Sequence, residues 1–334
     1  MINFCTLFDS YYLHKGIALY LSLLRQNVDF HLYVMAFDRD SFKALKNLSF
    51  DHMTVECMCD YEDDFFLKLK TERNKAEYCW TCGPFVIHHF LVNYKLPAIT
   101  YLDSDLFFIG NPQIAFNEIG DNSVAITEQG VSEESSKKYG KYCVQFMYFK
   151  NDQNSLSALE WWRDACYNWC YQRVEDGKFG DQKYLDYFPQ KFKNVYVIKN
   201  PGVGIAPWNV HRHKFKNSGL SILGEKKYDS VFFHMHGVRV YVHNNELLLD
   251  LDHFFIKNED REYFFNPYAE LMLEVFNKYL GQNILDYKVK GVANWRKLEF
   301  LIRSKLSKVH LLKKIYHKIH GETEHNHGTK IVKK

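Results

Sequence analysis

Short apolar runs alternate with segments of helical periodicity along the first part of the chain. An apolar run over residues 3–8 is followed, between Leu13 and Leu24, by five apolar residues at helical spacing. This pattern predicts a strand, a turn and a helix. Comparable signals predict strands at 30–37 and 53–57, a short helix at 42–48 and a helical stretch at 63–94 that breaks at Gly83-Pro84. The alternation is typical of an α/β fold built on a parallel sheet.

Two acidic side chains follow the next predicted strand. The apolar run 98–102 leads directly into Asp103-Ser104-Asp105, and a second apolar run follows at 106–108. Ligands of open α/β sheets gather at the carboxyl ends of the strands. A carboxylate beside buried backbone rarely lacks a partner. We therefore expect these aspartates to have a function, and hard divalent cations such as Mn²⁺ or Mg²⁺ favour such oxygen ligands.

The middle of the chain continues the pattern and then loses it. The remaining predicted elements are strands at 123–127, 144–149 and 228–233, a polar loop at 133–138 and a helix at 155–173. The segment 179–216 is rich in glycine, proline and aromatic residues, which is typical of active-site loops. Within it, residues 202–209 suit either stacking of Trp208 on a sugar or a turn with a buried tryptophan, and both interpretations stay open.

Basic and apolar residues interleave from about residue 294 to residue 319. The pattern predicts a basic amphipathic helix, which either lies on an anionic membrane surface or packs on the rest of the protein. Residues 320–334 are predicted to be a mobile tail. We therefore expect one domain over residues 1–255 and a C-terminal helical extension over residues 256–334.

Composition restricts the class of protein. The chain has 334 residues, of which 46% are hydrophobic and 17% aromatic, so it is predicted to fold. Its net charge of +3 gives no reason to expect nucleic acid as a partner. It has no signal-like start and no apolar run of about 18 residues. The predicted location is the cytoplasm, with peripheral contact at the inner face of the plasma membrane, and the eight cysteines are predicted to be buried reduced thiols.

Four segments follow one another in the order and approximate spacing of the motifs of a known family. They are Thr6-Leu7-Phe8-Asp9-Ser10-Tyr11-Tyr12, Tyr101-Leu102-Asp103-Ser104-Asp105, Asp181-Gln182-Lys183-Tyr184-Leu185 and His234-Met235-His236-Gly237. Together they resemble the retaining GT-A glycosyltransferases, which include glycogenin and the bacterial lipopolysaccharide and lipooligosaccharide galactosyl- and glucosyltransferases. The resemblance implies a GT-A (Rossmann-like) nucleotide-diphospho-sugar transferase domain.

The resemblance also implies roles for single residues. Asp103, Asp105 and His234 would bind Mn²⁺ or Mg²⁺, with His236 as the competing histidine. Asp181 and Gln182 would face the transferred sugar and act in catalysis. Arg239 is the nearest cation where the family has a Lys-Pro-Trp that is missing here. The residues expected to bind the donor or its ion are Thr6, Phe8, Asp9, Tyr11, Arg73, Asp103, Ser104, Asp105, His236, Gly237 and Arg239.

The implied activity is transfer of a hexose from a nucleotide diphosphate sugar, with UDP favoured. The acceptor would be a glycan or glycolipid in the synthesis of bacterial lipopolysaccharide, capsule or a similar surface polysaccharide. If the enzyme inverts, it needs a carboxylate base, for which Asp181 and Glu128 are candidates. One alternative is a sugar-phosphate nucleotidyltransferase, although the loop after the first strand lacks the glycine-rich basic pattern that holds a triphosphate. The other is a non-catalytic carbohydrate-binding protein with the same fold.

Overall fold

The computed structural model describes residues 1–215, 220–243, 246–250, 258–281 and 330–333. They belong to two compact units, Met1–His236 and Gly237–Lys334. The predicted domain boundary at residue 255 lies inside the second unit and stays a prediction. The predicted basic amphipathic segment and all of the predicted tail except 330–333 lie outside the described residues.

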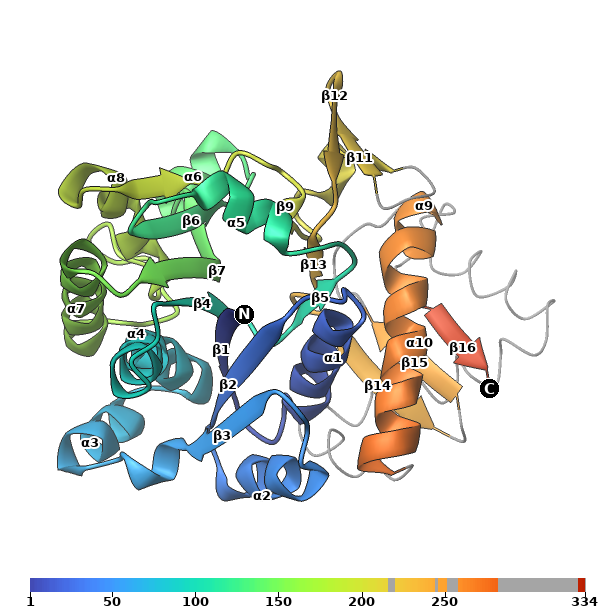
Figure 1. Ribbon diagram of the computed structural model, residues 1–334, viewed down its shortest axis with the longest axis horizontal. Helices are drawn as coiled ribbons and strands as arrows, with labels where there is room; N and C mark the ends of the chain where they lie inside the picture. The colour runs from blue at the N-terminus through green and yellow to red at the C-terminus, as the bar shows by residue number, and fades with distance from the viewer. Residues whose placement is uncertain (216–219, 244–245, 251–257, 282–329, 334) are drawn as a thin grey trace, which may run out of the picture. The chain divides into compact units, whose positions relative to one another are not determined.

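The first unit is built on a seven-stranded mixed sheet (Figure 1). Four neighbouring strands are parallel, and the seventh strand of the chain pairs antiparallel with both of its neighbours. The sequence pattern predicted a parallel sheet, whereas the structure has a mixed one. The order is β3 (Met53–Cys57), β2 (Phe30–Ala36), β1 (Ile2–Phe8), β4 (Ala98–Leu102), β7 (Tyr142–Lys150), β6 (Val124–Glu128) and β8 (Val195–Val197).

Eight helices of the first unit connect the strands. Most lie where the hydrophobic periodicity predicts a helix. They are α1 (Leu13–Leu24), α2 (Arg39–Leu48), α3 (Asp64–Glu72), α4 (Lys75–Asn93), α5 (Gln113–Ile119), α6 (Glu133–Tyr139), α7 (Gln153–Asn168) and α8 (Phe188–Lys191).

The predicted break at Gly83-Pro84 is wrong. The helical stretch breaks ten positions earlier because Asn74 caps α4: its side chain accepts a hydrogen bond from Glu77 N, and the Glu77 carboxylate accepts one from Asn74 N. This reciprocal pair satisfies two backbone donors that a helix start leaves without partners. Pro84 lies inside α4, which continues through it.

The predicted polar loop at 133–138 is also wrong, since these residues form α6. Ser132 caps this helix through a hydrogen bond from Ser135 N to its side chain. Acidic residues occupy the first turn and basic residues the last, as the helix dipole favours. The polar sequence therefore specifies an exposed helix, not a loop.

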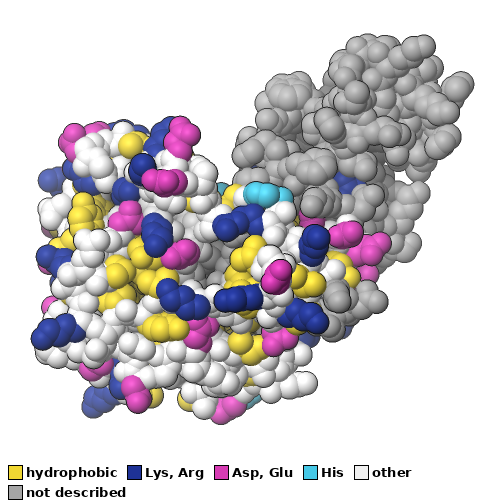
Figure 2. Space-filling view, turned by 90° about the horizontal axis from the view of Figure 1, so that it is seen from above, with side chains coloured by type: hydrophobic (Ala, Val, Ile, Leu, Met, Phe, Trp, Pro, Cys, Tyr) yellow, Lys and Arg dark blue, Asp and Glu magenta, His cyan; other side chains and the backbone are white. Residues whose placement is uncertain are grey.

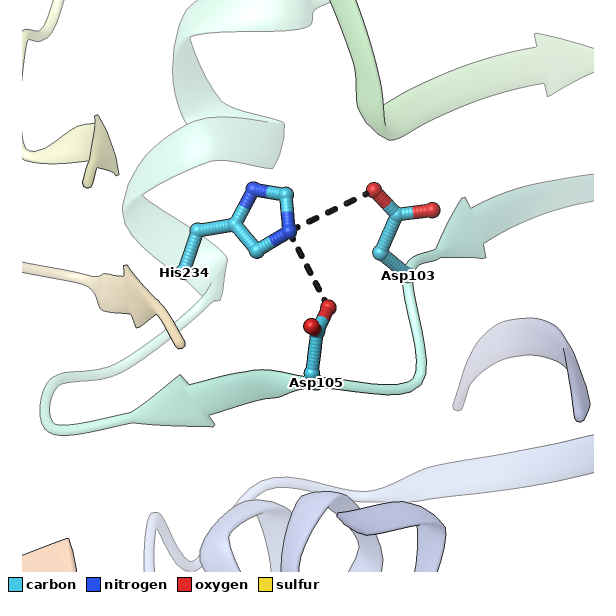
Figure 3. A group of neighbouring side chains, drawn as sticks. All are labelled: Asp103, Asp105 and His234. Carbon is cyan, nitrogen blue, oxygen red and sulfur yellow. Dashed lines mark ion pairs between the residues drawn. The ribbon is translucent and has the colours of Figure 1, made fainter. Parts of the chain in front are cut away.

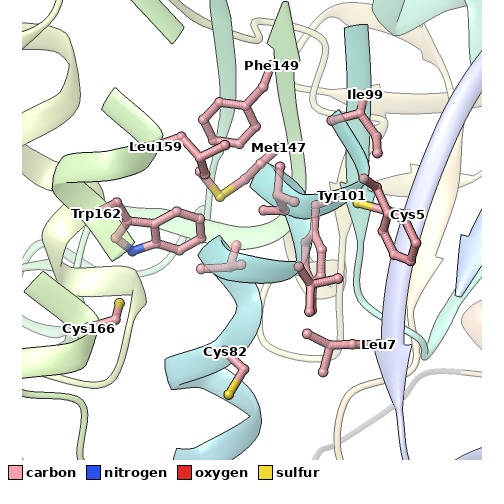
Figure 4. Packing of buried hydrophobic residues seen from close by; sticks show 14 of the residues in the cluster. Cys5, Leu7, Cys82, Ile99, Tyr101, Met147, Phe149, Leu159, Trp162 and Cys166 are labelled. Carbon is pink, nitrogen blue, oxygen red and sulfur yellow. The ribbon is translucent and has the colours of Figure 1, made fainter. Parts of the chain in front are cut away.

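Both faces of the sheet are covered. Neighbouring residues of β1 point to opposite faces, and residues on each face pack against other elements. Cys5 and Leu7 belong to the buried cluster of α4 and α7, in which the Trp162 ring stacks on Phe149 at 6.5 Å between centroids (Figure 4). Phe4 instead contacts Phe30, Phe108 and Phe116. Because both faces of the sheet are buried, a ligand can reach the sheet only at the ends of its strands.

A small second sheet lies where the first unit ends. Its order is β5 (Leu106–Phe108), β13 (Phe232–His234) and β9 (Val203–Ile205), and β13 runs antiparallel to β5 with His234 opposite Leu106. Two glycines allow this approach: a Cβ at Gly110 would lie 2.3 Å from Ser230 O, and one at Gly202 would lie 2.0 Å from Asp229 O. The pairing brings residue 234 beside the aspartates that follow β4.

The rest of the first unit consists of short elements. The segment predicted as loops contains β8, β9 and α8, and the strand predicted at 228–233 is divided between two strands. The additional elements are the 3₁₀ turns η1 (Met58–Asp60), η2 (Gln182–Tyr187) and η3 (Val210–Arg212), and an antiparallel sheet of β10 (Lys214–Phe215), β11 (Leu220–Leu223) and β12 (Lys226–Asp229).

The second unit contains an antiparallel sheet and a helical stretch. The sheet has the order β14 (Arg239–His243), β15 (Glu246–Asp250) and β16 (Lys330–Lys333). The helical stretch comprises α9 (Asn258–Asp260), η4 (Arg261–Phe265), α10 (Asn266–Val275) and η5 (Phe276–Leu280), of which η4 and η5 are π-helical.

The surface charges, the cysteines and the hydropathy of the helices complete the description. On the face seen in Figure 2, Lys and Arg side chains are interspersed with Asp and Glu. The eight cysteines are free thiols, six of them buried. Within the described ranges, we find no helix with the length and hydropathy needed to span a bilayer.

Candidate active site

Three predicted metal ligands converge in the first unit. His234 Nε2 lies 3.0 Å from Asp105 Oδ1 and 3.6 Å from Asp103 Oδ2 (Figure 3). One ligand atom from each residue can be chosen so that all three lie within 4.8 Å of one another. Adjacent ligands of an octahedral ion, each about 2.1 Å from it, are about 3.0 Å apart. The three side chains therefore fit a small divalent cation.

Backbone hydrogen bonds fix the segments that carry these ligands. Asp103 follows β4, and its N–H donates to Gln145 O of β7 at 3.0 Å. Met235 N, directly after β13, donates to Asp105 O at 2.9 Å. The predicted metal ligands are thus tied to the ends of regular strands, which hold a site more rigidly than loops do.

Gln145 orients the histidine. His234 Nδ1 donates to Gln145 Oε1 at 2.8 Å, while Gln145 Nε2 donates to Thr127 Oγ1 at 3.4 Å. Because the amide donates to the threonine, its oxygen is the atom that accepts from the imidazole. This arrangement directs Nε2 of His234 toward the two aspartates, as the outer partners of metal-binding histidines do.

Lys15 of α1 also reaches the cluster. Its Nζ donates to Asp105 Oδ2 at 3.3 Å, and only 3% of its side chain is exposed. Burial lowers the pKa of Lys15, against the opposing effect of the Asp105 charge. The sequence interpretation missed this residue, because Lys15 is two positions from both Leu13 and Ile17 and so lies off the apolar face that their spacing predicts.

The electrostatics of the cluster favour a bound cation. Burial raises the pKa of Asp103 to about 6, against the pull of His234. Asp105 also resists ionisation through burial, but Lys15 and then His234 lower its pKa well below the usual range. Burial alone would lower the pKa of His234, but Asp105 raises it to about 10. A divalent ion bound here would replace the proton on His234 Nε2, because a metal-binding imidazole must be neutral.

The two predicted catalytic residues lie at the start of η2. Asp181 is 8% exposed, and its backbone carbonyl accepts a hydrogen bond from Trp162 Nε1 at 2.9 Å. Burial, together with the charge of Asp103, raises the pKa of Asp181 to about 8. Gln182 Nε2 donates to Tyr139 O at 2.8 Å, which fixes its amide. Asp181 is therefore electrostatically coupled to the metal cluster, whereas the catalytic roles of both residues stay predictions.

Of the residues predicted to bind the nucleotide, Asp9 has the clearest polar setting. Its Oδ2 accepts a hydrogen bond from Lys75 Nζ at 2.6 Å and its Oδ1 accepts one from Tyr12 N at 3.1 Å. Tyr11 is 43% exposed. Ser104 is buried between the aspartates of the metal cluster.

Two other predicted nucleotide contacts are buried. Thr6 is fully buried. The Phe8 ring packs against α1 so closely that a Cβ at Gly16 would lie 2.3 Å from it. The positions of these two side chains favour packing, and a direct contact of either with the nucleotide stays a prediction.

Arg73 points toward the end of a helix. Its Nη2 donates to the carbonyls of Cys166 and Tyr167, at 3.3 and 2.8 Å, at the carboxyl end of α7. Such contacts stabilise the carbonyls that a helix end leaves without partners. The predicted contact of Arg73 with the donor stays a prediction.

Trp208 lies beside both histidines. Its ring centroid is 5.4 Å from those of His234 and His236, and its Nε1 donates to Gln129 O at 2.8 Å. The neighbouring Asn209 side chain bonds to backbone groups of Gln129, Gly204 and Ala206. Asn209 therefore holds the loop, and the Trp208 ring lies beside the imidazole of His234.

The last two predicted donor ligands belong to the second unit. Gly237 has a φ of 72°, and Arg239 opens β14. Their contribution to the site stays a prediction.

Comparison with known proteins identifies relatives of this chain. No protein-family model matches it. The uncharacterized protein YfnF of Bacillus subtilis (strain 168) is 33% identical over 247 residues, which are 71% of this chain and 82% of YfnF. The chain belongs to the YfnF family. The uncharacterized protein YfnD of the same strain is 28% identical over 242 residues, 70% of this chain and 77% of YfnD.

Solved structures identify the fold of this member of the YfnF family. The galactosyltransferase LgtC, solved in complex with donor and acceptor sugar analogs, superposes with a TM-score of 0.52 over 81% of this chain and 95% of LgtC, at 10% identity. An active-site mutant of LgtC superposes with a TM-score of 0.51 over the same shares, at 12% identity. The chain has the GT-A glycosyltransferase fold, as the sequence motifs predicted.

Proposed function

We propose that the protein is a metal-dependent glycosyltransferase that moves a hexose from a nucleotide diphosphate sugar, preferably a UDP-sugar, to a glycan. The observation that carries this proposal is the convergence of Asp103, Asp105 and His234 at the strand ends of a GT-A fold. The imidazole favours Mn²⁺ over Mg²⁺, because Mg²⁺ takes oxygen ligands. His234 is the proposed ligand instead of His236, since its Nε2 faces both carboxylates.

In this proposal the chain's own residues bind and orient the donor. Asp9 with Lys75 contacts the nucleoside end, while Asp103, Asp105 and His234 hold the ion at the diphosphate. Breaking the anomeric bond leaves extra negative charge on that diphosphate, and the bound ion supplies the Lewis-acid charge that neutralises it. Because the ligands are already in place, little reorganisation is needed when this charge develops.

Asp181 and Gln182 are proposed to face the transferred sugar. In a retaining reaction, which the motif resemblance favours, both side chains contact the transferred sugar and stabilise it as it reacts. In an inverting reaction, Asp181 removes the acceptor proton, for which a pKa of about 8 is suitable near neutral pH. Glu128 is less suited to that role, because it is half exposed and paired with Lys141 at 3.1 Å.

The deciding experiment uses Asp103→Asn and Asp105→Asn. We expect the wild type to be stabilised against heat by UDP with Mn²⁺, and to hydrolyse a UDP-hexose slowly when acceptor is absent. Each variant should lose the Mn²⁺-dependent stabilisation and at least roughly 100-fold in turnover. Unchanged Mn²⁺-dependent hydrolysis by Asp105→Asn would contradict the proposal. Stabilisation by glycans without any UDP effect would instead indicate a carbohydrate-binding protein.

The proposed acceptor is a glycan or glycolipid precursor of lipopolysaccharide, capsule or a similar surface polysaccharide. The motivation is the motif resemblance together with the basic amphipathic pattern at 294–319, which suits a cytoplasmic enzyme on an anionic membrane. Truncation after Tyr287 should lower recovery with membranes more than turnover on a soluble acceptor. Equal recovery with and without this segment would contradict the membrane role.

A further inference from the structure

Asp38 ties the loop after β1 to the start of α2. It directly precedes α2, and its Oδ1 accepts hydrogen bonds from Ser41 N at 2.8 Å and from Ser41 Oγ at 2.7 Å. Its Oδ2 accepts from Ser10 N at 2.9 Å and from Ser10 Oγ at 2.6 Å. One oxygen thus caps the helix, as an aspartate at this position commonly does. The other oxygen holds a loop 28 positions earlier in the chain, which capping does not require.

Ser10 lies between two residues that are proposed to bind the donor. Asp9 precedes it and accepts a hydrogen bond from Lys75 of α4 at 2.6 Å, and Tyr11 follows it and is 43% exposed. Both donors of Ser10, its N–H and its hydroxyl, are directed at Asp38. Because the backbone is fixed at Ser10, the directions in which its two neighbours leave the chain are fixed as well.

Asp38 is ionised in this arrangement. Burial opposes its ionisation, but its hydrogen bonds, of which that from the Ser10 side chain has the largest effect, bring its pKa below the ordinary value. Hydrogen bonds to an ionised carboxylate are stronger than those to a neutral acceptor. The negative charge by itself disfavours an anionic nucleotide nearby. A benefit of Asp38 to donor binding must therefore come from the position of the loop and not from the charge.

We propose that Asp38 is a positioning residue that acts through Ser10 to hold the loop after β1 ready for the nucleoside end of the donor. The inference rests on the proposed function, in which Asp9 of this loop contacts the nucleoside. A loop that is held in its binding conformation before the ligand arrives loses less entropy on binding. Loss of Asp38 Oδ2 should therefore lower the affinity for the nucleotide, although no group that touches the nucleotide is removed.

The test is Asp38→Ser, because a serine still caps α2 while its single oxygen replaces only Oδ1. If the loop then keeps its binding conformation about one tenth of the time, the dissociation constant for UDP with Mn²⁺ rises about tenfold, as isothermal titration measures. KM for a UDP-hexose should rise with it while kcat stays within about twofold, the pattern of lost ground-state binding. An unchanged dissociation constant in the folded variant, or a fall in kcat at unchanged KM, overturns the inference.

Asp152→Ser is the matched control. Asp152 directly precedes α7, and its Oδ1 accepts from Ser155 N at 3.0 Å while its Oδ2 accepts from Ser123 Oγ at 2.8 Å. It follows β7 at the edge of the sheet where the antiparallel β4 begins, opposite the edge that carries Asp103. The control loses the same charge and the same kinds of hydrogen bond, and it should bind UDP as the wild type does. An equal loss of affinity in both variants would overturn the specific role of Asp38.

Ser10→Ala tests the same contact without changing any charge. It removes one of the two hydrogen bonds to Asp38 Oδ2 and should raise the dissociation constant for UDP about threefold. Ser41→Ala removes a hydroxyl bonded to Oδ1 instead and should leave this constant unchanged. Wild-type affinity in Ser10→Ala would overturn the inference even if Asp38→Ser failed to fold. A wild type that binds no UDP with Mn²⁺ would refute the proposed function itself, which is a different outcome from unchanged affinity in the variants.

Discussion

The side-chain oxygen of Gln145 lies 2.8 Å from His234 Nδ1, and this hydrogen bond joins two strands across 89 positions of the chain. It leaves Nε2 directed at Asp103 and Asp105. The orientation of the histidine thus depends on Gln145. Among the described contacts, the Gln145 side chain makes no hydrogen bond to either aspartate side chain. Loss of this acceptor should weaken metal binding without removing any ligand.

We expect Gln145→Met to lower the affinity for Mn²⁺ about 10- to 100-fold, because the imidazole is then free to rotate or change tautomer. Isothermal titration with Mn²⁺ in the presence of UDP measures the effect. Gln153→Met is the control, since this exposed amide donates only to Ser157 on the surface of α7 among the described contacts. Wild-type affinity in Gln145→Met would show that the hydrogen bond has no influence on the metal.

Asp181→Asn should separate binding from turnover. The amide keeps the size of the buried side chain but lacks the negative charge and the basicity of a carboxylate. We expect turnover of a UDP-hexose to fall at least roughly 100-fold while Mn²⁺-dependent stabilisation by UDP remains. The exposed Asp164→Asn is the control. Near-normal turnover in Asp181→Asn would exclude the proposed catalytic role.

His213 should make the fold sensitive to acid. Burial, with smaller contributions from Arg212 and His211, lowers its pKa to about 4. An unfolded histidine has a pKa near 6.5. Between these values the unfolded chain binds the proton and the folded chain does not, so the stability is complete above about pH 6.5 and decreases as the pH falls toward 4.

His213→Phe should remove this part of the acid sensitivity. The imidazole stacks on Phe215 at 5.9 Å between centroids, and its buried Nδ1 makes no hydrogen bond within the described part of the chain. The variant should lose about 2–3 kcal/mol less than the wild type between pH 7 and pH 4, as measured by urea unfolding. The exposed neighbour His211→Phe is the control, and parallel curves for wild type and His213→Phe would contradict the prediction.

The cap of α4 makes a measurable contribution to stability. Asn74→Ala removes the oxygen that accepts from Glu77 N and should lower the free energy of unfolding by about 1 kcal/mol. Asn74→Asp keeps an acceptor and should stay near the wild type. If the alanine and aspartate variants are equally stable in urea, the capping box does not determine where α4 begins.

The sequence predicted the strands and helices with strong periodicity, and with them the strand end that carries Asp103 and Asp105. The resemblance of the late His-Met-His-Gly segment to a motif of a known family implied His234 as a metal ligand. These signals are local: each depends on residues within about one element of the chain. The GT-A fold was implied by the resemblance of four segments, in their order along the chain, to the motifs of a known family.

The residues that sequence reasoning missed act at a distance. Lys15 and Gln145 look like a helix residue and a strand residue, and only the tertiary pairing brings them to the metal ligands. Two secondary-structure predictions were wrong because another short-range feature outweighed the one on which the prediction was based. The Asn74 cap decided the start of α4 despite Pro84, and charge placement made α6 a helix where polarity suggested a loop.

The antiparallel register of His234 with Leu106 has a consequence for biosynthesis. During translation, the two aspartates leave the ribosome long before the histidine, and many intervening residues must be made first. A nascent chain therefore carries two of the three proposed metal ligands well before β13 can dock on β5.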